Sequence, residues 1–277
     1  MLFRSTRTRV WLKRGISIFM LLCSYVQTVA AGKLPGASIS RTRVADAPRG
    51  RLPQRGKTAN LRCPFARKEP APMIPDAPVD IDRIKGFLAA DEALALYRHA
   101  LAACAAGPVL EIGSYCGKST VCLGLACQRQ GSTLFAIDHH RGSEEHQPGE
   151  MFHDPELFDG GEAVVDSFRE FRRNIRAAGL EQVVVPIVAG SEPAARHWNT
   201  SLGMVFIDGG HSLEAALTDY RCWAPHIARG GILAIHDLFA DAHQGGQAPY
   251  AVYRMALASG LFEAVEQVDS LGLLRRL

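Results

Sequence analysis

Acidic residues and histidines end four short apolar runs of this sequence. They are Glu111 in the run 109–112, Asp138 after 134–137, Asp208 after 204–207, and His236 with Asp237 after 232–235. Carboxylates in such positions could bind a cation or accept hydrogen bonds from ribose hydroxyls, and an imidazole could accept a proton. Because parallel strands bring their carboxyl ends to one edge of a sheet, we expect these side chains to surround one site.

The stretch 109–120, Val-Leu-Glu-Ile-Gly-Ser-Tyr-Cys-Gly-Lys-Ser-Thr, indicates a strand, a glycine turn and a helix, where open α/β sheets bind cofactors. Two kinds of cofactor loop do not match it. A phosphate-binding loop, G-x-x-x-x-G-K-S/T, requires a glycine where Ile112 stands. A dinucleotide loop reads G-x-G-x-x-G, whereas here three residues separate Gly113 from Gly117, and Glu111 would repel a pyrophosphate.

S-adenosylmethionine suits these residues better, because it carries a sulfonium and an amino group and no phosphate. A carboxylate at Glu111 would attract its cationic methionine part. Gly113 and Gly117 would let the backbone approach the cofactor closely, and Asp138 could accept hydrogen bonds from both ribose hydroxyls. The three features together favour this cofactor.

With these residues in place, 109–120 resembles the first motif of class I S-adenosylmethionine-dependent methyltransferases. Residues 111–119 are especially similar to the catechol O-methyltransferase group. The stretch 206–211, Phe-Ile-Asp-Gly-Gly-His, resembles a bacterial methyltransferase family with an Ile-Asp-Gly-x-His motif, and the similarity covers most of residues 80–277. The resemblance implies cofactor contacts from Glu111, Gly113, Tyr115, Gly117, Ser119 and Asp138, with Ser191 and Glu192 beside the adenine.

A divalent cation is a second candidate ligand. Asp208 and Asp237 end adjacent strands in the expected topology, so their oxygens could share one cation, with Mg²⁺ favoured by hard oxygen ligands. His236 as a third ligand would shift the preference toward a transition metal. In the catechol group the matching positions bind magnesium, but here His236 replaces one carboxylate of that pattern. Reactions with and without a metal both stay open.

His211 is the candidate catalytic base, and Asp208 is the second candidate catalytic residue. His211 stands three residues after Asp208, where the catechol group has its catalytic lysine. An imidazole could take the proton from an acceptor hydroxyl as the methyl group leaves sulfur. The alternatives are that His211 caps the helix beginning at 212–213, or that it orients Asp208.

Strands and helices alternate along the rest of the chain. We expect helices over 82–106, from the glycine turn to about 130, and over 163–178, 193–198, 213–227 and 250–259; strands at 109–112, 134–137, 183–188, 204–207 and 232–235; and a hairpin of 262–268 with 271–274. This pattern predicts a doubly wound, mostly parallel seven-stranded sheet of the Rossmann-like methyltransferase type, with an antiparallel C-terminal hairpin at or near its edge.

Two segments between these elements are expected to border the site. The charged segment 139–154 follows Asp138 directly, and we interpret it as a substrate lid, with a solvated loop as the alternative. The loop 241–249 would be the second wall. The four arginines of 163–178 are interpreted as a solvated face.

Charge and composition divide the chain into three parts. Residues 1–72 hold 15 Lys and Arg and two acidic residues, whereas residues 73–277 hold 16 Lys and Arg and 26 Asp and Glu. Segment 1–32 has the shape of a signal peptide or is an artefact of translation upstream of Met73, and it is too short and polar for a stable membrane span. Segment 33–78 is basic and expected to be disordered. The methyltransferase domain is expected over 79–277.

The cysteines and the acidic domain bear on location and partners. Seven cysteines without a C-x-x-C pair are typical of a reducing cytoplasm, so a cytoplasmic location is expected, with secretion or N-terminal membrane anchoring as the alternative if 1–32 is genuine. The acidic domain lacks a basic, aromatic-interleaved surface, so no nucleic-acid partner is expected.

These features predict transfer of a methyl group from S-adenosyl-L-methionine to a hydroxyl of a small-molecule substrate, with or without Mg²⁺ or another divalent cation. Two alternatives stay open. One is a non-catalytic cofactor-binding or regulatory module of the same fold. The other is an NAD-linked oxidoreductase, which Glu111 and the turn spacing disfavour.

Overall fold

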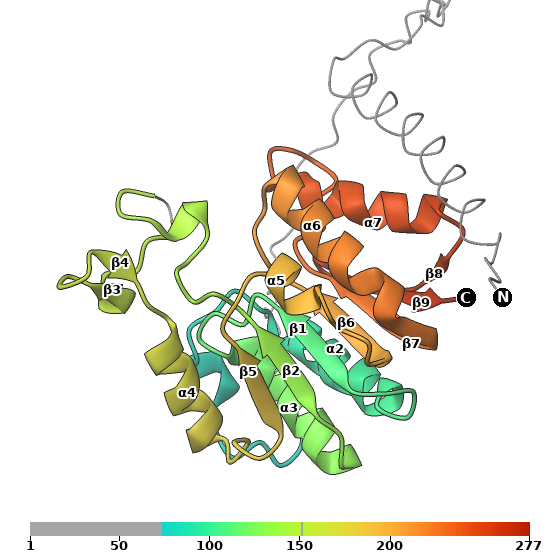
Figure 1. The fold of residues 1–277 in the computed structure, drawn as a ribbon, viewed down its shortest axis with the longest axis horizontal. Helices are drawn as coiled ribbons and strands as arrows, with labels where there is room; N and C mark the ends of the chain where they lie inside the picture. The colour runs from blue at the N-terminus through green and yellow to red at the C-terminus, as the bar shows by residue number, and fades with distance from the viewer. Residues whose placement is uncertain (1–73, 151) are drawn as a thin grey trace, which may run out of the picture. The chain divides into compact units, whose positions relative to one another are not determined.

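The computed structural model describes residues 74–150 and 152–277 (Figure 1). The segment 1–32, and the segment 33–78 as far as residue 73, lie outside the described residues. The helices are α2 (Ala90–Ala103), α3 (Lys118–Gln130), α4 (Phe168–Ala177), α5 (Ser191–Ala195), α6 (Leu213–Trp223) and α7 (Ala248–Ala258). Short 3-10 turns are η1 (Ile81–Arg83), η2 (Glu144–His146), η3 (Pro155–Leu157) and η4 (Ala224–His226). Among the described residues, no helix combines the length and apolarity needed to cross a bilayer.

One large sheet organises the domain. Its strands are β1 (Val109–Ile112), β2 (Leu134–Ile137), β5 (Val184–Ile187), β6 (Leu202–Ile207), β7 (Ile227–Ile235), β8 (Phe262–Val268) and β9 (Leu271–Arg276), in the order β5-β2-β1-β6-β7-β9-β8. All neighbours from β5 to β7 pair in parallel, and β9 runs antiparallel to β7 and β8. The predicted fold is confirmed. The chain reverses direction across the sheet between β1 and β6, and ligands bind at such switch points.

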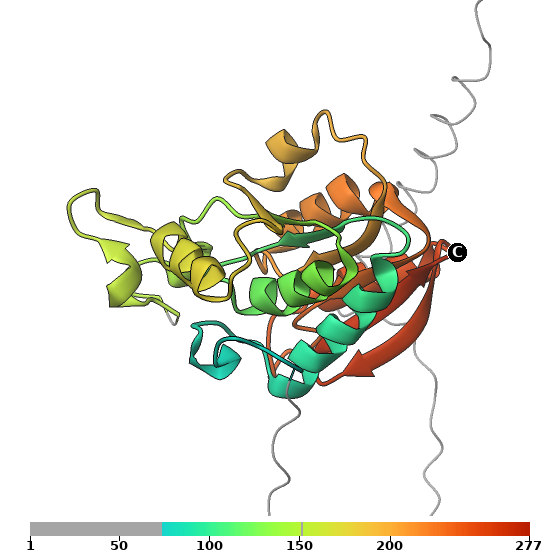
Figure 2. The same ribbon diagram turned by 90° about the horizontal axis from the view of Figure 1, so that it is seen from below.

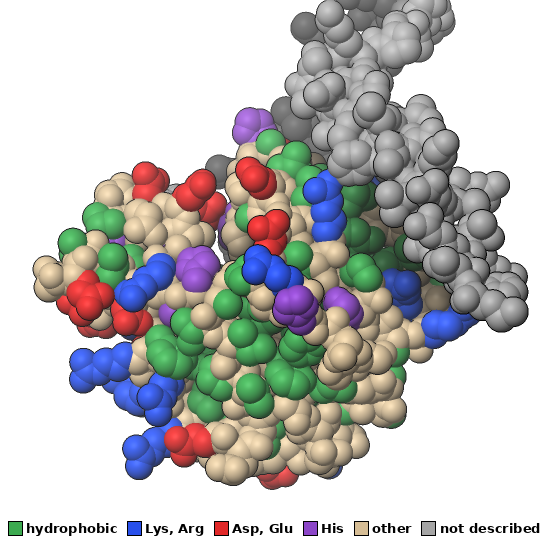
Figure 3. Space-filling model, viewed as in Figure 1, with side chains coloured by type: hydrophobic (Ala, Val, Ile, Leu, Met, Phe, Trp, Pro, Cys, Tyr) green, Lys and Arg blue, Asp and Glu red, His purple; other side chains and the backbone are tan. Residues whose placement is uncertain are grey.

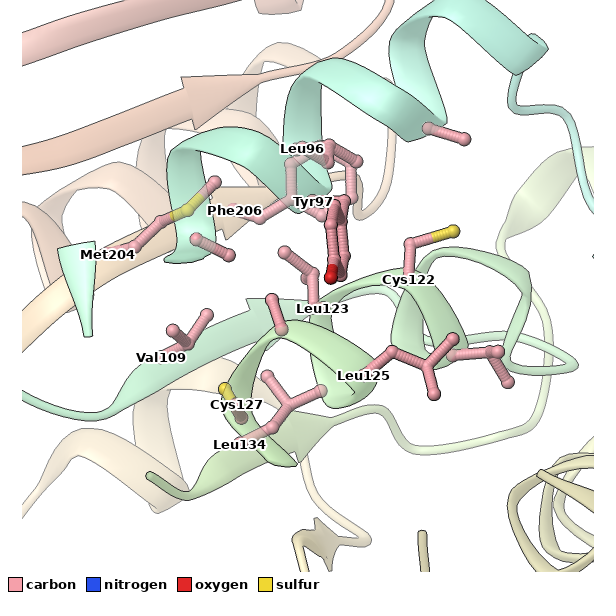
Figure 4. Packing of buried hydrophobic residues seen from close by; sticks show 14 of the residues in the cluster. Leu96, Tyr97, Val109, Cys122, Leu123, Leu125, Cys127, Leu134, Met204 and Phe206 are labelled. Carbon is pink, nitrogen blue, oxygen red and sulfur yellow. The ribbon is translucent and has the colours of Figure 1, made fainter. Parts of the chain in front are cut away.

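Helices cover both faces of the sheet (Figure 2). One apolar cluster joins α2, α3 and α4 to the sheet, and a second joins α6 and α7 to the opposite face. Figure 4 shows the first cluster, in which Leu96 of α2 and Leu123 of α3 pack with Phe206 of β6. This core also includes Ile74, which is 5% exposed, so the packed part of the chain extends ahead of residue 79.

The side chains of β1 alternate between these two clusters, as a strand requires. Val109 packs on the α3 face, whereas Leu110 and Ile112 pack on the α6 face. Glu111 shares the face of Val109 and is directed toward α3. This direction decides its role below.

The segment after β2 contains more structure than the sequence indicated. The helix expected over 163–178 begins at Phe168, because Val164–Val165 (β4) pairs with Phe158–Asp159 (β3) in a small antiparallel hairpin. The helix α4 that follows is basic on its exposed side, and Figure 3 shows Lys and Arg side chains gathered over it. This agrees with the solvated face expected there.

The boundary between α6 and β7 also differs from expectation. The helix expected to continue to residue 227 ends at Trp223, because Pro225 has no N–H to extend it and the chain forms η4 instead. β7 then starts at Ile227, ahead of the strand expected at 232–235.

Candidate active site

A cavity of about 470 Å³ lies at the carboxyl ends of β1, β2, β6 and β7. The glycine turn, the end of β2, the lid segment and the loop after β6 all contribute to its lining. Of the residues proposed from sequence, those that line it are Gly113, Tyr115, Ser119, Asp138, Ser191, Asp208, His211 and Asp237. Glu111, Gly117, Glu192 and His236 are not among the lining residues.

The glycine turn is held against the end of β6. Gly113 has φ +86°, and a Cβ at this position would overlap the backbone carbonyl oxygen of Asp208. Gly117 has φ +92° and is the N-cap of α3. Only glycine adopts these conformations without strain, so both glycines are explained by backbone geometry.

Glu111 lies beneath this turn and has a different place from the one expected. Its side chain is fully buried and accepts hydrogen bonds from Ser119 Oγ (2.6 Å) and Thr120 Oγ1 (2.5 Å). Burial raises the pKa of Glu111 to about 7. The predicted contact with the cationic part of the cofactor is therefore wrong for this structure. Glu111 ties the end of β1 to the first turn of α3, which agrees with its position on the α3 face.

Asp138 lines the cavity at the end of β2. Its two carboxylate oxygens accept backbone hydrogen bonds, one from Tyr115 N (2.8 Å) and one from His140 N (2.7 Å). Each oxygen keeps a further lone pair, so ribose hydroxyls can still bind here. The same bonds join the glycine turn to the beginning of the lid.

Ser191 and Glu192, expected beside the adenine, are separated by the structure. Ser191 is buried at the cavity wall, donates to Asp219 Oδ1 (2.5 Å) and accepts from Trp223 Nε1 (3.0 Å). Glu192 is exposed and outside the lining. Burial raises the pKa of Asp219 to about 6. The sequence analysis did not propose Asp219. Its spacing from Ala216 and Trp223, three and four residues, places it on the same buried face of the helix, and this could have indicated a role in the site.

Three polar side chains converge at the ends of β6 and β7. Asp208, His211 and Asp237 each present one ligand atom, and these atoms lie within 4.8 Å of one another. His211 Nε2 is 2.9 Å from Asp237 Oδ2, and its Nδ1 is 3.1 Å from Glu145 Oε2. The hydrogen bond to Asp237 outweighs burial and, with the charge of Glu145, raises the pKa of His211 to about 9. Glu145 belongs to the lid and was not among the proposed site residues.

Other residues fill the two structural roles considered for His211. Ser212 caps α6, because its side chain accepts a hydrogen bond from Ala215 N at 3.2 Å. Asp208 is instead oriented by His236, whose Nδ1 lies 3.0 Å from Asp208 Oδ1. This leaves His211 facing the cavity and pairing only with carboxylates among the described residues.

His236 is enclosed between two acidic side chains. The residue is 4% exposed, and its Nε2 lies 3.0 Å from Glu92 Oε2 in the first turn of α2. Although burial lowers the pKa of His236, the charge of Asp208 and the hydrogen bonds from Asp208 and Glu92 raise it to about 11. Burial opposes ionisation of Glu92, but His236 holds the pKa of Glu92 down to about 2.

The prediction that His236 is a metal ligand is therefore corrected. Its ring nitrogens are engaged in hydrogen bonds to Asp208 and Glu92, and the ligand atoms that converge in the structure belong to Asp208, His211 and Asp237. The buried cation instead fixes Asp208. Glu92 also accepts hydrogen bonds from Ser270, so three distant parts of the chain meet at this pair. Sequence spacing alone contains no signal for that meeting.

The lid segment lies beside the glycine turn, where the rings of Tyr115 and His146 have centroids 5.1 Å apart. Residues 142–146 line the cavity, so the segment borders the site as expected, and its role as a lid stays a prediction. Lys85 holds it from the other side, with Nζ 2.6 Å from Asp154 Oδ2 and 2.5 Å from Glu156 Oε2. Above the turn, the ring of Phe87 contacts those of Tyr115 and Phe152. The segment 85–88 was missed as part of the site.

The loop 241–249 does not have the place predicted for it. None of its residues lines the large cavity, so it is not the second wall of the acceptor site. Its last residue, Pro249, borders a smaller hollow together with His211 and His236. The wall of the large cavity that was expected from 241–249 is formed instead by the segment 85–88 and the lid.

The strand order, the glycine turn and the acidic rim define a class I methyltransferase fold. Residues 110–238 match the family model Methyltransf_24, described as a methyltransferase domain. Over these residues the chain is similar to that family.

Solved structures with this fold include proteins of low sequence identity. The O-methyltransferase NovP has a TM-score of 0.53 at 15% identity, covering 68% of this chain and 80% of that one. Cofactor-bound Rv0187 from MTB has a TM-score of 0.51 at 17% sequence identity, and the match covers 70% of this chain and 84% of that one. The SAH-bound methyltransferase PaMTH1 of Podospora anserina has a TM-score of 0.51 at 15% sequence identity, and the match covers 74% of this chain and 89% of that one. At these identities the likeness concerns the fold.

Proposed function

We propose that this protein transfers a methyl group from S-adenosyl-L-methionine to a hydroxyl of a small molecule. One observation carries the proposal: a single cavity is lined both by the glycine turn with Asp138 and by Asp208, His211 and Asp237. A donor and an acceptor would therefore meet in one enclosed place, where positioning supplies much of the rate.

The cofactor half of the cavity favours S-adenosylmethionine. Asp138 offers hydrogen-bond acceptors for ribose hydroxyls, and the turn at Gly113 brings backbone rather than side chain to the cavity wall. Two of the solved structures with this fold are described as bound to cofactor or to SAH. A non-catalytic module would keep these features, so cofactor binding and turnover need separate tests.

His211 is the proton acceptor in this proposal. The carboxylates of Asp237 and Glu145 raise its pKa to about 9, so near neutral pH most of the resting protein carries a protonated ring. Only the neutral form accepts the proton, so turnover should increase as the pH rises toward 9. The acceptor oxygen attacks the methyl carbon as its proton passes to His211, and the methyl–sulfur bond breaks in line with the attack. Asp208, oriented by His236, lines the cavity beside this ring.

A divalent cation fits the same residues. Asp208 and Asp237 offer carboxylate oxygens, and His211 offers a ring nitrogen when it is neutral, which together are a donor set that Mg²⁺ or a transition metal accepts. Such a cation, when bound, would lower the pKa of the acceptor hydroxyl. The requirement is decided by measuring turnover with and without a chelator.

Calorimetric titration with S-adenosylmethionine tests the cofactor site. Asp138→Ala should weaken binding about 10- to 100-fold, because charge-assisted hydrogen bonds to the ribose are lost. Glu192→Ala is the matched control, since Glu192 is exposed outside the cavity, and its affinity should stay unchanged. Absence of binding by the unmodified protein at millimolar cofactor would reject the proposal.

Turnover is tested by screening hydroxylated acceptors for release of S-adenosylhomocysteine. For an accepted substrate, His211→Ala should lower kcat by about 100-fold or more while retaining cofactor affinity. Full turnover in that variant would remove His211 as the base. Cofactor binding without turnover on any acceptor class would favour the non-catalytic module.

A further inference from the structure

Two cysteines that the proposed reaction does not use lie in contact at the amino end of β1. Cys104 is the C-cap of α2 and precedes β1, and Cys127 lies in the last turns of α3. Their Sγ atoms are 3.8 Å apart. Because the cavity lies at the carboxyl ends of the strands, this pair stands at the opposite end of β1 from the reaction.

The two thiols have different surroundings. Cys127 is fully buried in the core cluster with Val109 and Leu134, which Figure 4 labels with it. Cys104 is half-buried and reaches solvent. The hydrogen bond between the two sulfurs lowers the pKa of Cys104 to about 7 although burial opposes this, and the same contact raises the pKa of Cys127. A reachable thiolate therefore faces a protected thiol.

We propose that Cys104 and Cys127 are an oxidisable pair that forms an intramolecular disulfide on reaction with a hydroperoxide. The Cys104 thiolate attacks one peroxide oxygen, the O–O bond breaks, and a sulfenic acid forms with release of hydroxide. Cys127 sulfur then attacks the sulfenic sulfur, the S–S bond forms, and water leaves with the Cys127 proton. Two thiols lose two electrons and two protons, and hydrogen peroxide becomes two molecules of water.

Formation of this bond requires the two sulfur atoms to move together. A disulfide needs an S–S distance of about 2.05 Å, so the sulfurs must approach by roughly 1.8 Å. Cys127 is fixed, because its carbonyl oxygen accepts a hydrogen bond from Ser132 N at 2.8 Å. Cys104 stands at a helix end and is followed by the small, exposed residues Ala105 and Ala106, so its side chain supplies the movement.

The bond would enclose the part of the chain that forms the cofactor turn. The loop from 104 to 127 contains β1, the glycine turn and most of α3. Closing a loop of this length restricts the unfolded chain, so the oxidised protein should melt about 10 °C higher than the reduced protein.

The other described cysteines provide internal controls. Cys116 and Cys122 are fully buried, and burial raises the pKa of both to about 12. Cys222 is half-buried on α6, on the opposite face of the sheet. These thiols should therefore react more slowly than Cys104.

Peptide mapping of the full chain tests the proposal. The protein is treated with hydrogen peroxide, remaining thiols are alkylated, and trypsin is added without reductant. Cleavage after Arg98, Lys118 and Arg129 places the pair on peptides 99–118 and 119–129. We expect these peptides joined, with Cys116 and Cys122 alkylated and a mass two hydrogens below the sum of the two singly alkylated peptides. Fragmentation should assign the bond to Cys104 and Cys127, while Cys222 is alkylated on 222–229.

Two variants keep the test decisive. Cys104→Ser changes a half-exposed residue, so it should fold, lose the joined peptides and lose the rise in melting temperature. Cys116→Ser should retain both. A bond through Cys116 or Cys122, sulfinic acid on Cys104 without a bond, or thiols that stay reduced at peroxide levels that oxidise free cysteine would each overturn the proposal.

Discussion

Glu145 of the lid and His211 of the loop after β6 meet across the cavity, although they are 66 residues apart in sequence. Glu145 Oε2 lies 3.1 Å from His211 Nδ1, while Nε2 of the same ring is 2.9 Å from Asp237. One ion pair therefore holds the lid to the group proposed as the base. The same contact joins the lid segment to the proposed base.

The first prediction concerns this contact. Glu145→Gln should loosen the lid, because the neutral amide no longer attracts the imidazolium. The pair is partly exposed, so its contribution is about 0.2–1 kcal/mol, and amide hydrogens at 142–146 should exchange up to about fivefold faster. Hydrogen-exchange mass spectrometry measures this, with Glu144→Gln as the control. Equal rates in both variants would mean that other contacts, such as the ion pairs of Lys85 and Arg141, hold the lid.

The second prediction concerns the buried pair of Glu92 and His236. Glu92→Gln leaves the buried imidazolium with Asp208 but without its second partner, which should lower the free energy of unfolding by about 3 kcal/mol. Urea denaturation measures the loss. Asp91→Asn, which changes an exposed neighbour in the same turn, should stay within about 0.5 kcal/mol of the parent. If the Glu92→Gln variant were as stable as the Asp91→Asn control, His236 would not need the second charge.

The sequence was sufficient for the sheet and for the edge where the site lies. Apolar runs ending on Asp138, Asp208 and Asp237 predicted parallel strands whose ends share one edge of the sheet. Each run and its terminal acidic residue can be identified from a few neighbouring residues, without knowledge of the rest of the fold. The contacts of Glu92 and Glu145 could not be predicted in this way. Each joins segments far apart in the chain, and their meeting depends on helix packing and on the path of the lid.

Glu111 is a different case, because the signal was present and was interpreted wrongly. A residue at the end of a strand reaches the cavity only if its side chain is directed there, and side chains alternate along a strand. Val109 packs on the α3 face of the sheet, so the side chain of Glu111, two residues later, is directed to the same face. There it accepts hydrogen bonds from Ser119 and Thr120. Alternation should be applied before a strand-end carboxylate is assigned to a ligand.

The third prediction follows from that burial. The pKa of Glu111 rises from 4.5 to about 7 on folding, so its neutral form is favoured in the folded protein. Its contribution to stability is fully present below about pH 4.5 and is lost as the pH rises through 7, with a change of about 3 kcal/mol at most. Glu111→Gln removes this titration, so the variant should gain stability relative to the parent between pH 5 and pH 8. Denaturation curves at both pH values measure it, and parallel pH profiles for the two proteins would contradict it.

The last prediction separates backbone strain from steric overlap at the glycine turn. Gly113 and Gly131 both have positive φ, +86° and +64°, so alanine at either position costs about 1 kcal/mol in backbone conformation. Of these two positions, only at Gly113 would the added Cβ overlap the backbone just after β6, at the carbonyl oxygen of Asp208, whereas at Gly131 no atom lies within 4 Å. Gly113→Ala should therefore destabilise the fold by about 1–2 kcal/mol more than Gly131→Ala. It should also weaken S-adenosylmethionine binding at least tenfold, because β1 and β6 are forced apart at the cavity, while Gly131→Ala leaves binding unchanged. Equal effects of the two substitutions on cofactor affinity would mean that the turn does not depend on its contact with β6.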